Sequence, residues 1–146
     1  MQFRGFFLGM ENIENIYKLF KTVKRICTDS RRIEQGSLFF ALKGDNFDGN
    51  KYATDAINKG CVAAVVDDKD IATDERFYYV PDSLKALQDL AIMHRLNLKI
   101  PIIAITGSNG KTTTKELLAA VLSRKYRVSY TSGNRNNHIG VPLTIL

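Results

Sequence analysis

The sequence predicts an α/β fold, because runs with the character of buried strands alternate with stretches of helical periodicity. Residues 38–42, 62–66 and 100–105 are short and almost wholly apolar, as in strands that helices cover on both faces. Between such runs, apolar residues recur at the three- and four-residue spacing of amphipathic helices. This alternation is typical of parallel sheets whose strands are joined through helices.

Local signals define each element. Ile13 and Ile16 belong to a helical pattern, Gly60 is suited to end a helix as a C-cap, and Asp82 and Ser83 are both suitable N-caps. In order, we expect a helix over 11–23, strands over 25–28 and 38–42, a helix over 52–59, strands over 62–66 and 77–80, a helix from 82 to 98, a strand over 100–105, a helix over 111–125, a strand over 127–130, and a helix or strand from 141.

The charge is distributed unevenly along the chain. Residues 1–94 hold 13 Lys/Arg and 14 Asp/Glu, whereas residues 95–146 hold 8 Lys/Arg and a single acid, Glu116. The basic residues form no dense run interleaved with aromatics, so an anionic small substrate explains the bias better than nucleic acid does. The domains predicted from this change are 10–98 and 99–146, after an extension or misplaced start over 1–9.

Several classes of protein do not fit the composition. No apolar run reaches the roughly 20 residues that cross a bilayer, so we expect no membrane insertion. Cys27 and Cys61 have no metal-type spacing and are interpreted as reduced, buried residues of a cytoplasmic protein, with a disulfide between them as the alternative. The second domain would hold only two strands of a parallel sheet, so we expect this chain to be the N-terminal part of a longer protein.

The segment Thr106–Thr114 has the pattern of a phosphate-binding loop between a strand and a helix. Glycines let the backbone N–H groups surround a phosphate, Lys111 supplies charge for the transferred phosphoryl group, and the hydroxyl of Thr112 is a magnesium ligand. The motif is the short form, because Ile105 stands where the general motif has glycine. We expect ATP with Mg²⁺, Lys111 as the catalytic residue, and as nucleotide contacts Gly107, Ser108, Asn109, Gly110, Lys111, Thr112 and Thr113.

Two further segments are rich in polar residues. The asparagine-rich segment, residues 131–142, follows the predicted strand 127–130 and is expected at the same carboxyl edge as the phosphate loop, where ligands of α/β sheets bind. It contains Asn136 and Asn137. The segments 28–32 and 36–50, taken alone, are better explained as strands and turns with solvated charges than as a binding site.

Together, in this order, the three segments resemble the Mur ligase family over residues 10–146. Thr106–Glu116 resembles its ATP loop, and Gly133–Thr144 resembles a segment of the member that adds a D-alanyl dipeptide. The resemblance implies a domain that binds a UDP-linked substrate, followed by the first part of a phosphate-loop ATPase domain built on a parallel sheet. The residues implied as substrate contacts are Ser30, Arg31, Asn50 (where the family often has histidine), Asn136 and Asn137.

The implied reaction joins D-alanyl-D-alanine to a UDP-N-acetylmuramoyl-tripeptide in peptidoglycan synthesis, with ATP and Mg²⁺, in a cytoplasmic monomer. A third domain and further catalytic residues would lie beyond Leu146, so we expect the 146-residue chain alone to be inactive. Three alternatives remain: the diamino-acid-adding ligase of the same family, a non-catalytic nucleotide-binding module, and an unrelated phosphate-loop ATPase or GTPase.

Overall fold

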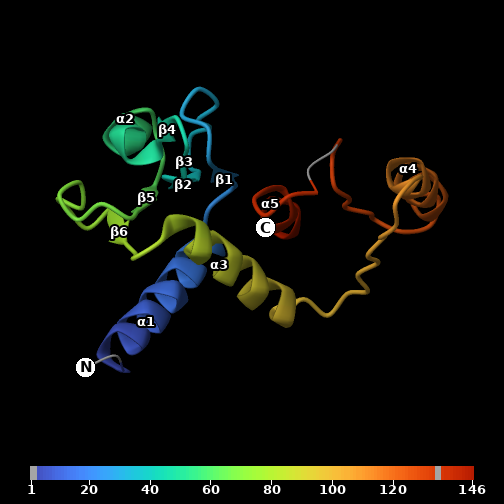
Figure 1. The fold of residues 1–146 in the computed structure, drawn as a ribbon, viewed down its shortest axis with the longest axis horizontal. Helices are drawn as coiled ribbons and strands as arrows, with labels where there is room; N and C mark the ends of the chain where they lie inside the picture. Colours follow the sequence, from blue (N-terminus) through green and yellow to red (C-terminus); the bar gives the residue numbers. More distant parts are fainter. Residues whose placement is uncertain (1–2, 134–135) are drawn as a thin grey trace.

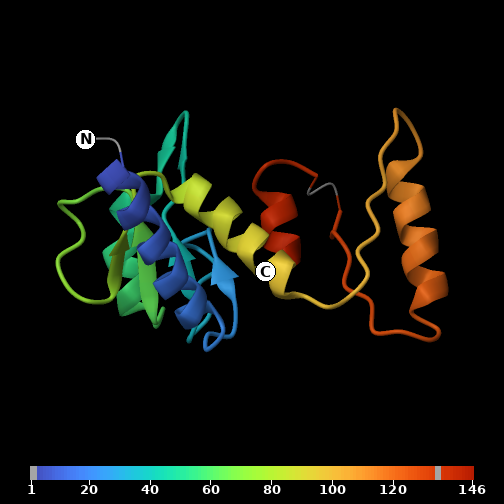
Figure 2. The ribbon, with the colours of Figure 1, turned by 90° about the horizontal axis from the view of Figure 1, so that it is seen from below.

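The computed structural model describes residues 3–133 and 136–146. Figures 1 and 2 show a sheet with helices α1, α2 and α3 around it, and helix α4 standing well away from that sheet. The elements are α1 (Phe3–Phe20), β1 (Ile26–Cys27), β2 (Leu38–Phe40), β3 (Lys43–Gly44), β4 (Phe47–Asp48), the 3₁₀ helix η1 (Gly49–Tyr52), α2 (Ala53–Asn58), β5 (Ala63–Val66), β6 (Phe77–Tyr79), α3 (Ser83–Asn97), α4 (Lys111–Leu122) and α5 (Gly140–Ile145).

Four strands form a parallel sheet in the order β1-β2-β5-β6. Phe39 in β2 lies opposite Cys27 on one side and Ala64 on the other, so β2 and β5 are the central strands. Because β2 separates β1 from β5, the strand that carries Cys27 and the one that follows Cys61 are not neighbours. Both cysteines are buried and free, as the first interpretation expected.

The sheet has an apolar core on each face. Alternate residues of a strand point to opposite faces, so Leu38 and Phe40 of β2 pack on one side and Phe39 on the other. The first side is covered by Ile13 and Ile16 of α1 and by buried leucines of α3. The second is covered by α2, which lies across the sheet from α1 and α3 in Figure 1. The predicted α/β class is therefore confirmed for this part of the chain.

Several element bounds differ from those predicted. Helix α1 begins at Phe3 and ends at Phe20, so residues 3–9 continue the helix expected over 11–23. An antiparallel hairpin of β3 and β4 was not predicted, because each strand has only two residues. It leads into η1, which takes Tyr52 out of the helix expected over 52–59.

Two predicted strands are wrong. Residues 100–105 and 127–130 have no strand structure, and among the described residues neither segment pairs with a neighbour. A strand is defined by its ladder of hydrogen bonds, so an apolar sequence alone does not make one. Ile100 and Ile103 are accordingly 58% and 59% exposed. Helix α4 starts at the expected Lys111 but ends at Leu122, three residues early.

The segment from residue 141 is helical, and this helix, α5, packs on α3. Ile139, Leu143 and Leu146 contact the core between α1, α3 and the sheet. Gln88 of α3 also donates a hydrogen bond to the carbonyl of His138, at 3.2 Å. The two helices lie side by side in both Figure 1 and Figure 2.

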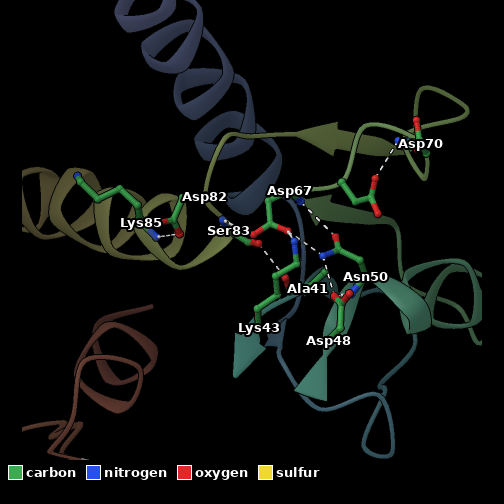
Figure 3. Close-up of polar contacts among 10 residues, drawn as sticks. Ala41, Lys43, Asp48, Asn50, Asp67, Asp70, Asp82, Ser83 and Lys85 are labelled. Atoms are coloured by element: carbon green, nitrogen blue, oxygen red, sulfur yellow. Dashed lines mark hydrogen bonds and ion pairs between the residues drawn. The ribbon is translucent and has the colours of Figure 1, made fainter. Parts of the chain in front are cut away.

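A polar junction, made of Lys43, Asn50, Asp67 and Ser83, joins four elements at the carboxyl end of the sheet (Figure 3). Asp67 directly follows β5. Its carboxylate accepts from Lys43 Nζ at 2.8 Å, from Asn50 Nδ2 at 2.7 Å and from the backbone N–H of Ser83 at 3.4 Å. Burial by itself would raise the pKa of Asp67, but the hydrogen bonds from Lys43, Asn50 and Ser83 outweigh it and leave the pKa lowered.

Side chains of the junction also form hydrogen bonds with backbone atoms and with the side chain of Asp48. The Ser83 hydroxyl donates to the carbonyl of Ala41 at 2.7 Å, at the end of β2. Asn50 Nδ2 donates to Asp48 Oδ1 at 2.9 Å, and Asn50 Oδ1 accepts from the Asp67 backbone N–H at 3.2 Å. The hairpin, η1, β5 and α3 are thus fixed to one another by a fully hydrogen-bonded network.

Beside this junction, Gly49 packs tightly against the backbone of Ala41 and Leu42, so we expect a side chain at this position to be destabilising. An added Cβ there would lie 2.6 Å from the carbonyl oxygen of Leu42, so Gly49→Ala must push η1 away from the backbone that follows β2. We expect it to lower the free energy of unfolding by about 2–3 kcal/mol, the usual cost of overpacking. Urea unfolding measures this. Gly44→Ala in the hairpin is the control, since its Cβ would meet nothing within 4 Å; equal effects of the two variants would contradict the structure.

The junction predicts a pH dependence. Because the pKa of Asp67 lies below its ordinary 3.8, its stabilising effect is complete at neutral pH and is lost as the pH falls through the folded value. Asp67→Asn should therefore lower the free energy of unfolding at pH 7 by about 2 kcal/mol, the scale of a hydrogen bond to a charged group. The difference from the wild type should shrink in acid.

Exposed Asp70, in the same turn, provides the control, and Asp70→Asn should change stability little. Chemical unfolding at several pH values checks both variants. A constant deficit for Asp67→Asn down to pH values well below 3.8 would contradict the assigned role of the carboxylate.

Candidate functional site

The phosphate loop owes its shape to two glycines. Gly107 has a φ of 147° and Gly110, the residue before α4, a φ of 78°, and residues with a side chain rarely adopt either value. A Cβ at Gly110 would meet nothing within 4 Å, and one at Gly107 only the carbonyl oxygen of Asn109, at 3.8 Å. Glycine is required here for the backbone conformation, and the space over the loop is open to a ligand.

Helix α4 begins on this loop with its N-terminus open. Gly110 is its N-cap, and no side chain caps the helix. The first-turn N–H groups of a helix lack intrahelical acceptors and carry its positive dipole end, which favours a phosphate. Thr112 and Thr113 are exposed in this turn, and both hydroxyls fit the role of ligands to a bound phosphate or Mg²⁺.

Lys111 folds back over its own loop. Its Nζ donates to the carbonyl of Gly107 and, at 3.3 Å, to that of Ser108. These contacts keep the ammonium group over the loop, beside the expected position of the phosphates. Ser108 and Asn109 are exposed at the tip of the turn. The predicted residues 107–113 therefore lie together in one loop and the first turn of α4, although the strand expected before the loop is absent.

The asparagine-rich segment is joined to α4 through Lys115, a residue that the sequence analysis did not select. Lys115 Nζ donates to the carbonyls of Thr131 and Gly133, at 2.5 and 3.2 Å. Asn136 is exposed. Asn137 is also exposed, and its Oδ1 accepts from the backbone N–H groups of Ile139 and Gly140, at 3.2 and 2.7 Å, at the start of α5.

Ser30 and Arg31 lie in the loop after β1. Ser30 is buried, whereas the side chain of Arg31 is exposed and forms a bidentate pair with Asp29, with Nε–Oδ1 and Nη2–Oδ2 distances of 2.9 Å. The hydrogen bonds from Arg31 lower the pKa of Asp29 to about 2, and the same pair raises the pKa of Arg31. The guanidinium has five N–H donors, so it retains donors for an anion.

Asn50 is 1% exposed, and its amide group is engaged in the polar junction. It nevertheless shares a sheet edge with Ser30 and Arg31, because both segments follow the carboxyl ends of parallel strands. Lys43, with its side chain 49% exposed, lies at the same edge and was missed by the sequence analysis. A signal was present: Asp67, its partner, comes directly after the apolar run 62–66. The substrate contacts assigned to these residues stay predictions.

Among the described residues, no helix is long and apolar enough to cross a membrane. The predicted ligand contacts with described side chains include residues at the carboxyl edge of the four-stranded sheet and in the loop at the start of α4.

Residues 105–146 match the family described as the Mur ligase middle domain. The UDP-N-acetylmuramoyl-tripeptide–D-alanyl-D-alanine ligase of Bacillus subtilis is 47% identical over 124 residues, which are 83% of this chain and 27% of that protein. The same ligase from Escherichia coli is 39% identical over 125 residues, 86% of this chain and 27% of the relative.

Solved structures give the same result. MurF from Acinetobacter baumannii is 42% identical, with a TM-score of 0.74 over 84% of this chain and 27% of its own. MurF ligase from Thermotoga maritima, solved in complex with ADP, is 35% identical, with a TM-score of 0.75 over 85% of this chain and 29% of its own. The chain spans less than a third of the length of these relatives. Since identity and fold agree over more than four fifths of its residues, the chain belongs to the Mur ligase family.

Proposed function

We propose that the complete protein is an ATP-dependent ligase that joins D-alanyl-D-alanine to a UDP-N-acetylmuramoyl-tripeptide. The observation that carries the proposal is the identity of 47% to a relative with this name, over a stretch that includes an open, glycine-defined loop at the start of α4. Peptidoglycan precursors of this kind are charged and water-soluble, which supports a reaction in the cytoplasm.

The loop residues Gly107–Thr113 would hold the phosphates of ATP. The backbone N–H groups at the start of α4 would receive them, and Lys111 would exchange its contacts with the Gly107 and Ser108 carbonyls for phosphate oxygens. Thr112 would supply a hydroxyl to Mg²⁺. ATP and Mg²⁺ together would supply an activated phosphoryl group.

The chemistry follows from the low electrophilicity of a carboxylate. A carboxylate oxygen of the tripeptide forms a bond to the γ-phosphorus, and the bond to the ADP oxygen breaks. The dipeptide amine then attacks the carbonyl carbon of the acyl phosphate, loses a proton, and displaces inorganic phosphate. Lys111 would offset the negative charge that spreads over the phosphoryl oxygens during the first step.

We assign the UDP end of the substrate to the first domain, residues 10–98, and ATP to the domain that begins at 99. The exposed guanidinium of Arg31 and the hydroxyl of Ser30 lie at a carboxyl sheet edge, the usual ligand position in α/β folds. Asn136 and Asn137 would contact the tripeptide carboxylate or the metal, between the UDP site and the ATP site.

The test is a ligation assay with the complete gene product, ATP, Mg²⁺, the UDP-tripeptide and D-alanyl-D-alanine. ADP release that requires both the UDP-tripeptide and D-alanyl-D-alanine is expected, with a UDP-pentapeptide as product. Release that requires a diamino acid instead would transfer the proposal to another ligase of the family. Binding of UDP and ATP at separate sites without turnover would favour a non-catalytic module. The 146-residue chain alone should release no ADP in response to the dipeptide.

Lys111 gives a quantitative prediction. Lys111→Ala removes the charge aimed at the β and γ phosphates, so the dissociation constant for Mg·ATP should rise at least about tenfold, which corresponds to ~1.4 kcal/mol. Calorimetry on the complete gene product measures this constant. Lys125→Ala, just beyond the other end of α4, is the matched control and should bind ATP as the wild type does. Unchanged affinity in Lys111→Ala would contradict the proposed site.

A further inference from the structure

Lys115 is a cation with no part in the phosphate-loop motif, yet its side chain is only 16% exposed. It lies one turn after Lys111 in α4. A lysine ammonium has three N–H donors. Those of Lys115 face the carbonyl of Thr131 at 2.5 Å, the carbonyl of Gly133 at 3.2 Å and Glu116 Oε1 at 3.0 Å. The ammonium is thus satisfied by protein groups and has no donor left over for a ligand.

These contacts join two segments that carry predicted ligand contacts. Helix α4 starts at the phosphate loop, and Thr131–Gly133 lead toward Asn136 and Asn137. The ammonium also lies 5.7 Å from the ring centroid of Tyr130, so it contacts this segment at three residues, Tyr130, Thr131 and Gly133. A cation that is largely removed from water is costly unless it is paired, so this arrangement tolerates little displacement of either segment.

Apolar packing contributes little to the position of α4 in the described part of the chain. Ala119 is its buried hydrophobic residue there, whereas Leu117 and Val121 are 64% and 68% exposed. The polar contacts of Lys115 are therefore the specific link between α4 and residues 130–133. Hydrogen bonds are directional, so these contacts fix the distance and orientation of residues 130–133 relative to α4, which non-directional apolar packing would not do.

We propose that Lys115 is a positioning residue that holds the asparagine-rich segment at a set distance from the phosphate loop. The proposal rests on the proposed function, because alignment of a carboxylate substrate with the γ-phosphate is what this distance would control. Lys115 touches neither reactant. Its loss leaves the glycines, Lys111 and Thr112 of the nucleotide site in place, and it releases the segment that precedes Asn136 and Asn137.

Three variants of the complete gene product test this. Lys115→Met keeps the length of the side chain but removes every donor, and Lys115→Arg restores several donors. Lys125→Met is the matched control. Lys125 is exposed, and among the described residues its ammonium contacts the ring of the neighbouring Tyr126. Steady-state kinetics give kcat and KM for the UDP-tripeptide, and calorimetry gives the dissociation constant of Mg·ATP.

For Lys115→Met we expect kcat/KM for the UDP-tripeptide to fall on the order of 100-fold, the effect of misplacing reactants by about 1 Å. The dissociation constant of Mg·ATP should change less than about threefold, which also shows that the variant folds. Lys115→Arg should recover most of the loss, and Lys125→Met should match the wild type. ATP binding weakened as strongly as in Lys111→Ala, or kinetics of Lys115→Met equal to those of Lys125→Met, would overturn the proposal.

A second measurement separates this proposal from the proposed function. Hydrogen exchange of the peptide that spans residues 126–133 requires no turnover. It should be faster in Lys115→Met than in the wild type and Lys115→Arg, whatever reaction the protein catalyses. If the wild type fails to ligate but this difference in exchange is seen, the proposed function is wrong. The role of Lys115 as a link between α4 and residues 130–133 is then still supported. Equal exchange in all variants would overturn the link itself.

Discussion

The hydrogen bonds and ion pair of the Asp67 carboxylate are the interactions on which the arrangement around the four-stranded sheet depends. This carboxylate stands at the end of the central strand β5 and receives hydrogen bonds from the hairpin, from η1 and from the first residue of α3. Apolar packing on the two faces of the sheet stabilises the layers, but it does not fix their ends. The largely shielded carboxylate of Asp67 joins them, because its oxygens accept from three different elements. The hairpin, η1 and the start of α3 are therefore joined at the carboxyl edge of the sheet, the edge at which the loop with Ser30 and Arg31 also lies.

The phosphate loop depends on a different constraint. Its shape comes from the positive φ angles of Gly107 and Gly110 and needs no tertiary contact, which explains why it forms although the segments on either side make no sheet. The relation of this loop to the rest of the site is tertiary, and in this structure it is set by the ammonium of Lys115. The two surfaces proposed to bind anions thus each lie beside one charged side chain with partners distant in sequence, Asp67 and Lys115.

Local signals in the sequence predicted local structure well. Asp82 caps α3 by accepting from the backbone N–H of Lys85 at 2.9 Å, and α4 begins at the expected Lys111. The strand predicted over 100–105 was wrong because strand formation requires a partner, which apolar composition cannot supply. Asn50 was predicted as a substrate contact, and the structure shows that it is buried in the junction. Its burial depends on Asp67, 17 residues away, and no spacing rule relates the two.

The sequence by itself determined the α/β class, the starts of α3 and α4 and the glycine-defined loop, because each follows from the preferences of neighbouring residues. The tertiary structure alone decided which polar groups meet: Lys43 with Asp67, and Lys115 with Thr131 and Gly133. Pairs of this kind depend on how strands and helices cross in space. A lysine that binds a ligand and one that holds two segments together look the same in the sequence, and the burial and partners of the ammonium distinguish them.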